Sequence, residues 1–431
     1  EGVSGPGGGL SGAGGGQGGC LGLVADEGVS GPGGGLSGAG GGHGGVRAGW
    51  RSGGVQVGGA RRIGKGPVMI DGLEAFFDAR HRGVAEELTQ FAATSMGAYA
   101  SAHDDAEARA QTPEAVRLMG RAGWLQTQDS RTLCLFREAV AAVSPLADAV
   151  FAIQGLATVP LRLSGYGGPW LERASLGLAV GGFAMTEPEA GSDVANIQTL
   201  ARPDGDGWRL QGRKWLISNA GIADFYVVFA RFEGAEGSRG IGAFLVEREE
   251  VHFAGAQVLS APHPLGQLEF RDSRALLLDR EGFKLGMRTL DTMRVSVAAA
   301  ACGMAGRALR EALEHAKSRR QFGQSLSEFQ LIQAKLAQMA LALETSRLLT
   351  YRAAWQRDQG RERNTREVAM AKAQATEQAQ FVIDSAMQIL GGRGMLADSP
   401  VEHLYRAVRA LRIYEGTTEV QYLIIAKDLL K

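Results

Sequence analysis

The chain has 431 residues, and its 46 basic and 46 acidic side chains give a formal net charge of zero at pH 7. This balance excludes a strong global attraction to nucleic acid or to an anionic membrane surface, and the length allows two or three domains. Three scattered cysteines and seven dispersed histidines provide neither a metal-ligand spacing nor a disulfide framework, which favours a reducing compartment.

The first 68 residues form a glycine-rich segment in which Glu1–Gly16 recurs as Glu27–Gly42. Its few apolar side chains cannot offset the conformational entropy lost on ordering, so we predict a disordered tail over residues 1–68. The first methionine is Met69, where the globular pattern also begins. We interpret the tail as a dispensable segment or an artefact of start-site assignment.

Residues 69–182 are predicted to form an N-terminal helical domain. Apolar side chains recur three and four positions apart after Leu73, and a second apolar helical pattern covers residues 146–163. Thr112, which is followed by Pro113, has the pattern of a helix N-cap with proline at the first helical position. No run of about 18 apolar residues occurs, so no transmembrane helix is expected.

Residues 183–276 have the composition of a small β-barrel or sandwich. The segments 225–230 and 241–246 are short and rich in aromatic and β-branched residues, which is typical of strands. Asp204–Gly207 separates two strand-like segments and predicts a hairpin.

Residues 277–431 are predicted to form a C-terminal four-helix bundle. Ser327–Gln330 has a capping-box pattern before a long helix, and Thr365–Leu390 forms a second long helix that Gly391 ends. The polar loop between the two helices makes them an antiparallel pair. The fold class is therefore α+β, with helical segments on both sides of a sheet domain.

Four segments contain the residues on which a functional hypothesis can be built. In chain order they are Ala184–Asp193, Arg319–Gly323, Gln388–Gly392 and Arg412–Gln421. Together they resemble the acyl-CoA dehydrogenase family over about residues 70–430. The resemblance implies FAD between the sheet domain and the bundle, and a homodimer or homotetramer whose subunits share the cofactor site.

Dehydrogenation of an acyl thioester needs a base for the α-proton and an acceptor for a hydride. No side chain accepts hydride, so a cofactor must. No Gly-x-Gly-x-x-Gly follows a predicted strand, which disfavours a Rossmann-type site. The resemblance assigns the base to Glu415, whose pKa would have to be raised by burial, and assigns its N–H to the thioester oxygen. A minority of the family has its base at the position that matches Met293. A methionine cannot act as a base, so this position is excluded here.

The ordinary alternative for Glu415 is a carboxylate that interacts with the dipole of the following helix. The other segments also have ordinary alternatives to a functional role. These are a turn at Thr186, a helix stop at Gly391, and a surface ion pair between Asp291 and Arg294.

The resemblance also implies a set of binding residues. For the flavin ring these are Met185, Thr186 and Ser218. For the rest of the dinucleotide, partly from a neighbouring subunit, they are Arg319, Gln321, Phe322, Gln388, Gly391, Gly392, Thr417 and Glu419. For the substrate they are Ser192, Asp291, Arg294, Tyr414 and Gly416.

One motif departs from the family pattern, which is Lys-x-Trp-Ile-Thr/Ser-Asn. Lys214, Ser218 and Asn219 match it, but the tryptophan stands one position early as Trp215, and Leu216 takes its place. In a regular strand this shift turns the side chain to the other face, whereas a local bulge would restore it.

The leading hypothesis is FAD-dependent oxidation of an acyl-CoA to the trans-2-enoyl-CoA. Flavin N5 accepts the hydride, and an electron-transfer flavoprotein accepts the electrons. A flavin acyl-CoA oxidase and a catalytically silent flavin-binding homologue are the alternatives. We expect a cytoplasmic protein, or one of the mitochondrial matrix, with no metal, nucleic-acid or membrane partner.

Overall fold

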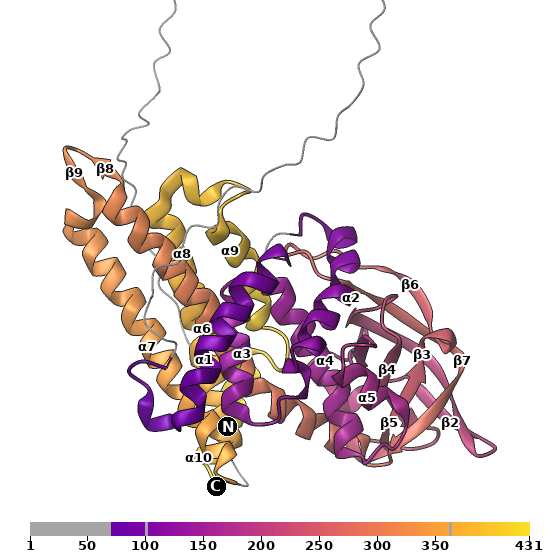
Figure 1. The fold of residues 1–431 in the computed structure, drawn as a ribbon. Helices are drawn as coiled ribbons and strands as arrows, with labels where there is room; N and C mark the ends of the chain where they lie inside the picture. The colour runs from indigo at the N-terminus through magenta and orange to yellow at the C-terminus, as the bar shows by residue number, and fades with distance from the viewer. Residues whose placement is uncertain (1–69, 100–101, 362–363) are drawn as a thin grey trace, which may run out of the picture. The chain divides into compact units, whose positions relative to one another are not determined.

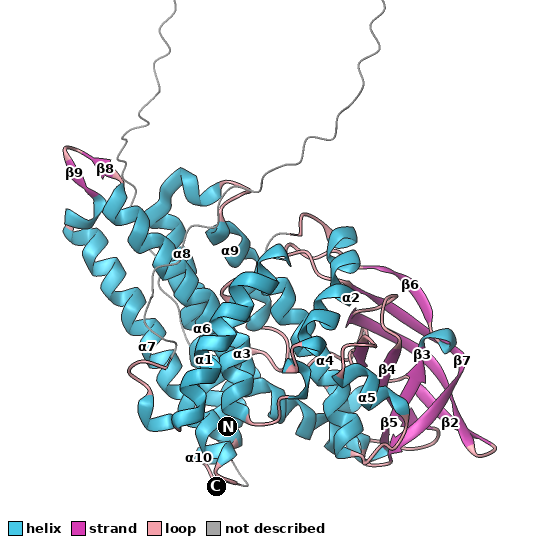
Figure 2. Ribbon diagram, in the orientation of Figure 1, coloured by secondary structure: helices cyan, strands magenta, loops and turns pink. Residues whose placement is uncertain are grey.

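A computed structural model describes residues 70–99, 102–361 and 364–431 (Figure 1). The tail predicted over residues 1–68 lies outside the described residues. In the described part, helical segments precede and follow a sheet domain, which confirms the predicted fold class (Figure 2).

Within the described residues, the first helical segment contains five α-helices before the sheet. They are α1 (Ala79–Phe91), α2 (Asp105–Arg121), α3 (Ser130–Ala141), α4 (Pro145–Leu163) and α5 (Pro169–Ser175).

Helix α2 begins earlier than the sequence pattern indicated. The predicted start at Thr112 is wrong, because Asp104 caps the helix by accepting the amide of Glu107 at 2.8 Å. Pro113 therefore lies inside α2. The Thr112 hydroxyl donates to the carbonyl oxygen of Ala108 at 2.8 Å instead of capping a new helix.

Helix α4 is long and apolar enough to cross a membrane by length and composition, but 72% of its most apolar stretch is buried inside the protein. It is therefore packed as a core helix.

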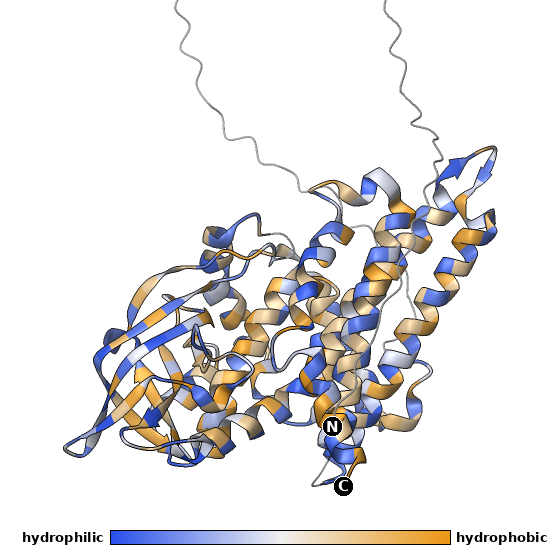
Figure 3. Cartoon of the chain, turned by 180° about the vertical axis from the view of Figure 1, so that it is seen from behind, coloured by the Kyte–Doolittle hydropathy of each residue, from blue (hydrophilic) through white to orange (hydrophobic). Residues whose placement is uncertain are grey.

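Seven strands form one sheet that closes on itself. They are β1 (Gly181–Ala184), β2 (Leu200–Asp204), β3 (Gly207–Ser218), β4 (Phe225–Phe232), β5 (Ile241–Glu247), β6 (His252–Ala256) and β7 (Leu265–Asp279). The order β4-β2-β3-β7-β5 returns to β4 through the β4–β5 pairing, so these five strands make a barrel. Hydrophobic and hydrophilic residues both occur in the sheet (Figure 3), and β4 and β5 are buried over most of their length. The predicted hairpin is confirmed, since Asp204 pairs with Gly207 where β2 meets β3.

The C-terminal segment contains α6 (Gly282–Ser318), α7 (Gln330–Asp358), α8 (Thr365–Leu390), α9 (Pro400–Leu411) and α10 (Thr418–Leu429). A two-stranded hairpin, β8 (Arg320–Gln321) with β9 (Gln324–Ser325), joins α6 to α7. The predicted capping box of Ser327 with Gln330 is wrong, because Phe329 is the N-cap of α7 and makes no side-chain cap. A capping box lies two residues earlier, where Ser325 pairs with Glu328 and begins a 3-10 turn before α7. Helix α8 has the predicted bounds.

Helix α6 is the central helix of this segment. Residues 293–305 are all buried, as expected for a helix that is surrounded by neighbours. Gly303 allows the closest approach, because a Cβ there would lie 2.1 Å from the carbonyl oxygen of Glu138 in α3.

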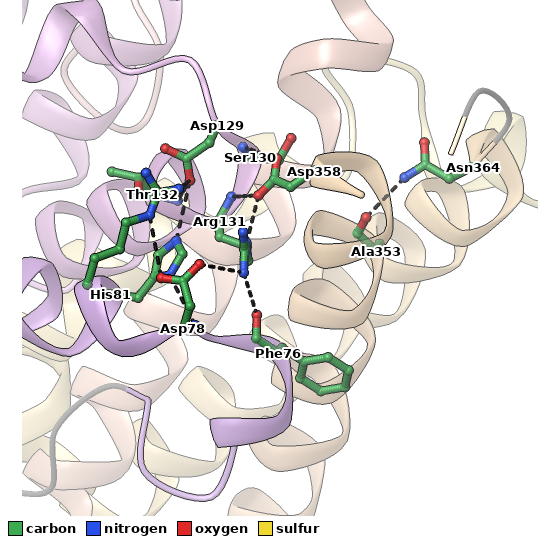
Figure 4. A network of polar contacts seen from close by, with 11 residues as sticks. Phe76, Asp78, His81, Asp129, Ser130, Arg131, Thr132, Ala353, Asp358 and Asn364 are labelled. Atoms are coloured by element: carbon green, nitrogen blue, oxygen red, sulfur yellow. Dashed lines mark hydrogen bonds and ion pairs between the residues drawn. The ribbon is translucent and has the colours of Figure 1, made fainter. Parts of the chain in front are cut away.

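A polar network ties the N-terminal helices to α7 (Figure 4). Asp358, at the end of α7, accepts hydrogen bonds from the amide of Ser130 at 2.7 Å and from Nε of Arg131 at 2.8 Å. Arg131 also donates to the carbonyl oxygen of Phe76 at 3.1 Å. One carboxylate thus accepts hydrogen bonds from backbone amides at the start of α3 that have no partner within the helix, and it fixes α3 against α7.

A buried ion pair links α3, α4 and α6. The Arg137 guanidinium donates to both carboxylate oxygens of Asp148 at 2.8 Å and to Oγ of Ser296 at 3.0 Å. Arg137 and Asp148 are 0% and 1% exposed. Removing one partner would leave the other partner's charge buried in the core, with neither a counter-charge nor water to stabilise it.

We expect Asp148→Ala to lower the free energy of unfolding by about 3–5 kcal/mol, because it strands the Arg137 guanidinium in the core. The double variant Arg137→Leu with Asp148→Leu should recover most of this loss. Urea unfolding at one fixed protein concentration measures both. The control is Lys284→Ala, which removes the exposed pair with Glu281 and should change stability little. If Asp148→Ala destabilises no more than this control, the pair has no such role.

Candidate active site

Glu415 lies in the turn between α9 and α10, in an uncommon backbone conformation. Its φ is +53°, in the left-handed region, and that of Gly416 is +89°. A Cβ at Gly416 would lie 2.7 Å from Nε2 of Gln421. A non-glycine residue in this conformation is strained, and such strain persists only where the surroundings hold it.

Two buried cations hold the turn by its carbonyl oxygens. Nζ of Lys372, in α8, donates to the carbonyl oxygens of Tyr414 at 3.1 Å and of Gly416 at 2.5 Å. Nε of Arg294, in α6, donates to the carbonyl oxygen of Glu415 at 3.0 Å. The structure thus places Arg294, which sequence analysis assigned to the substrate, on the backbone of the candidate base.

Sequence analysis missed Lys372. The available signal was a lysine flanked by Ala371 and Ala373 on the apolar face of a predicted helix, since a fully buried lysine needs a partner.

One oxygen of the Glu415 carboxylate is shielded from water. Its Oε2 atom is buried and has no hydrogen-bond partner among the described residues. Burial raises the pKa of Glu415 above its ordinary value, and the charges of Arg137, Arg294 and Lys372 oppose this effect. The net direction is upward, as a base for a weakly acidic carbon requires.

The end of β1 is fixed by a second buried lysine. Nζ of Lys214 donates to the carbonyl oxygen of Met185 at 3.0 Å and to the carboxylate of Glu187 at 2.7 Å. The Trp215 amide donates to the carbonyl oxygen of Thr186 at 2.9 Å. Met185 and Thr186 are therefore held against β3.

The shifted tryptophan motif lies on a bulge. The pairing of β3 with β7 changes register between Lys214 and Ile217, and Leu216 has a φ of +55°. Leu216 is exposed, and its amide donates to Oε1 of Gln257 at 2.9 Å. Of the two alternatives that the sequence left open, the structure shows the bulge.

Ser218 has a partner that sequence analysis missed. Its Oγ lies 2.7 Å from Nε2 of His263, in the loop before β7. Burial lowers the pKa of His263 to about 4, so the imidazole is neutral at pH 7. The only sequence signal is its position between two prolines.

Helix α6 connects the strand ends to Glu415. Gly286 makes room for Met185, whose Cε would lie 2.5 Å from a Cβ at that position. Arg294 follows eight residues later, which is ~12 Å along a helix. The strand ends and the Glu415 turn therefore lie beside the first half of α6.

The remaining predicted cofactor residues lie at the opposite end of α6. Arg319 is 25 residues beyond Arg294, which corresponds to ~37 Å of helix. The end of α8 lies there too, because Arg393 and Arg319 both act on His315 and, with burial, lower its pKa. One chain therefore does not bring Arg319, Gln321, Phe322, Gln388, Gly391 and Gly392 together with Glu415.

The other predicted residues lie near the Glu415 turn or on the surface. Thr417 caps α10 by accepting the Val420 amide at 3.3 Å, and Glu419 is exposed in the first turn of that helix. Asp291 pairs with Arg294 in α6. Ser192 is exposed in the loop after β1, and the Tyr414 side chain is partly exposed. No group of three or more metal-ligating side chains occurs in the described part of the chain.

Comparison with known proteins gives the relatives of this chain. Residues 182–276 match the model of the acyl-CoA dehydrogenase middle domain, and residues 280–430 match that of the C-terminal domain. The chain is 42% identical over 258 residues to the 3-(aryl)acrylate reductase of Clostridium sporogenes, covering 58% of this chain and 68% of that protein. It is 42% identical over 274 residues to the mitochondrial short-chain specific acyl-CoA dehydrogenase of Bos taurus, covering 61% and 66%.

Comparison with solved structures finds the same family. Butyryl-CoA dehydrogenase from Megasphaera elsdenii superimposes with a TM-score of 0.76 at 29% identity, covering 82% of this chain and 99% of that one. Members of this family are FAD-dependent oxidoreductases. The matches in sequence agree with the fold and with the order of the helical and sheet segments. The chain therefore belongs to the acyl-CoA dehydrogenase family.

Proposed function

We propose that this protein dehydrogenates an acyl-CoA thioester to the trans-2-enoyl-CoA, with Glu415 as the base that removes the α-proton. The observation that carries the proposal is the Glu415 carboxylate itself. Its Oε2 atom is buried without a partner among the described groups, and it lies in a turn that is held by two cations. A carboxylate that merely capped α10 would need no such surroundings.

The residues present fit FAD. Nothing lies within 4 Å of where a Cβ would be at Gly391 or Gly392, so a dinucleotide could approach the backbone there. Arg319 is exposed and has no acidic partner within the described ranges, which suits a phosphate. Met185, Thr186 and Ser218 would hold the ring, and FAD when bound supplies the hydride acceptor.

The chain's own groups then perform the proton chemistry. The Glu415 carboxylate takes the α-proton, and its low-dielectric surroundings raise its affinity for that proton. In this proposal the Glu415 N–H binds the thioester oxygen and so stabilises the charge that develops as the proton leaves.

The two groups of cofactor residues lie ~37 Å apart along α6 in one chain. We infer that a second copy supplies Arg319, Gln388 and Gly391 to the site, so the active species is a homodimer or a larger homo-oligomer. An electron-transfer flavoprotein is the proposed electron acceptor, by analogy with the family.

We expect butyryl-CoA to bleach the flavin absorbance under anaerobic conditions, and Glu415→Gln to slow bleaching by ~10²-fold or more, because it removes the general base. The panel begins with short-chain and arylpropanoyl thioesters, which the names of the relatives suggest. Glu86→Gln, on the exposed face of α1, is the matched control and should bleach like the wild type.

Undiminished bleaching in Glu415→Gln would show that another group is the base. Rapid reoxidation of product-bound enzyme by O2 would identify an oxidase. A purified protein without flavin would favour the silent homologue.

We also expect the bleaching rate at saturating substrate to rise with pH, with a midpoint above the ordinary glutamate pKa of 4.5, since burial raises the pKa of Glu415 and only the ionised carboxylate accepts a proton. Stopped-flow measurement across the acid range tests this. A rate that does not change down to pH 4.5 would contradict the assignment.

A further inference from the structure

We propose that Lys372 is a positioning residue, whose ammonium turns the peptide N–H of Glu415 toward the bound thioester oxygen. The inference rests on the proposed function and concerns what prepares the Glu415 turn for it.

The carbonyl oxygens of three successive residues accept hydrogen bonds from a small set of donors. The Glu415 carbonyl is held by Arg294, and that of Gly416 by both Lys372 and Gln421. The Tyr414 carbonyl is different, because Lys372 is its only donor in the described structure.

The Tyr414 carbonyl belongs to the same peptide unit as the Glu415 N–H. In a trans peptide these two groups lie in one plane and point in opposite directions. Lys372 pulls the carbonyl oxygen into the bundle, so the N–H of Glu415 is directed away from α8. No acceptor for this N–H lies within hydrogen-bonding reach among the residues described, so it is free for a ligand oxygen.

The left-handed φ of Glu415 makes this restraint necessary. A glutamate adopts that conformation only if neighbouring contacts outweigh its strain. Without the ammonium, the Tyr414–Glu415 peptide loses its only donor within the described structure and can rotate, which would carry the N–H away from the thioester oxygen.

The test compares two ligands in the Glu415→Gln background, where the thioester binds but is turned over slowly. Butyryl-CoA presents a carbonyl oxygen, and S-butyl-CoA has a CH₂ group in its place. Calorimetry on the flavin-loaded protein should give a preference for the thioester of roughly five- to tenfold, about the net effect of one hydrogen bond.

Adding Lys372→Met should reduce this preference to about twofold or less. Thr376→Val is the matched control. Thr376 is buried one turn along α8, and its hydroxyl contacts only the carbonyl oxygen of Lys372, so this variant should keep the preference. Lys372→Gln, which is too short to reach both carbonyls, replaces Lys372→Met if that variant does not fold.

A preference that persists in the Lys372 variant that folds would overturn the role of Lys372 and leave the proposed function intact. If Glu415→Gln alone shows no preference for the thioester, the role of Lys372 is overturned too, because the N–H makes no contact to be positioned. The proposed function is judged separately, by anaerobic bleaching of the wild-type flavin.

Discussion

The hydrogen bonds from Lys372 and Arg294 to the turn at Glu415 are the interaction on which the rest of the site depends. They join α6 and α8 to a segment between α9 and α10, and they sustain a backbone conformation that a glutamate does not adopt freely. The cost of burying the two cations is offset because each meets several oxygens. The same cations moderate the rise in the pKa of the Glu415 carboxyl, so burial and charge together set its basicity.

The length of α6 separates the predicted cofactor residues into two groups. Its first half contacts both the strand end at Met185 and the Glu415 turn, whereas Arg319 follows its last turn. A straight helix of this length cannot place both ends on one flavin. The length of α6 is thus the reason for proposing a cofactor site that is shared between copies, since one chain contains all the motifs without assembling them.

The sheet domain contributes groups that are oriented by buried partners. Lys214 holds Met185 and Glu187, and the neutral His263 lies beside the Ser218 hydroxyl. The bulge at Trp215 and Leu216 shifts the register of β3 against β7 at the position of the early tryptophan. The departure from the family pattern is thus a change in backbone geometry at the strand.

The sequence by itself determined the fold class, the bounds of α8, the β2–β3 hairpin and the family, because apolar periodicity, turn residues and local motifs depend on neighbours in the chain. The sequence pattern misplaced the start of α2. Thr112 followed by Pro113 is as good an N-cap pattern as Asp104, and the local sequence does not distinguish the two. Only the tertiary structure decided that Lys372 and Arg294 hold the backbone of the Glu415 turn, that His263 lies beside Ser218, and that the predicted cofactor residues separate into two groups. Those facts depend on which side chains from distant segments meet, and on burial, which sets the pKa of Glu415 and has no local signature.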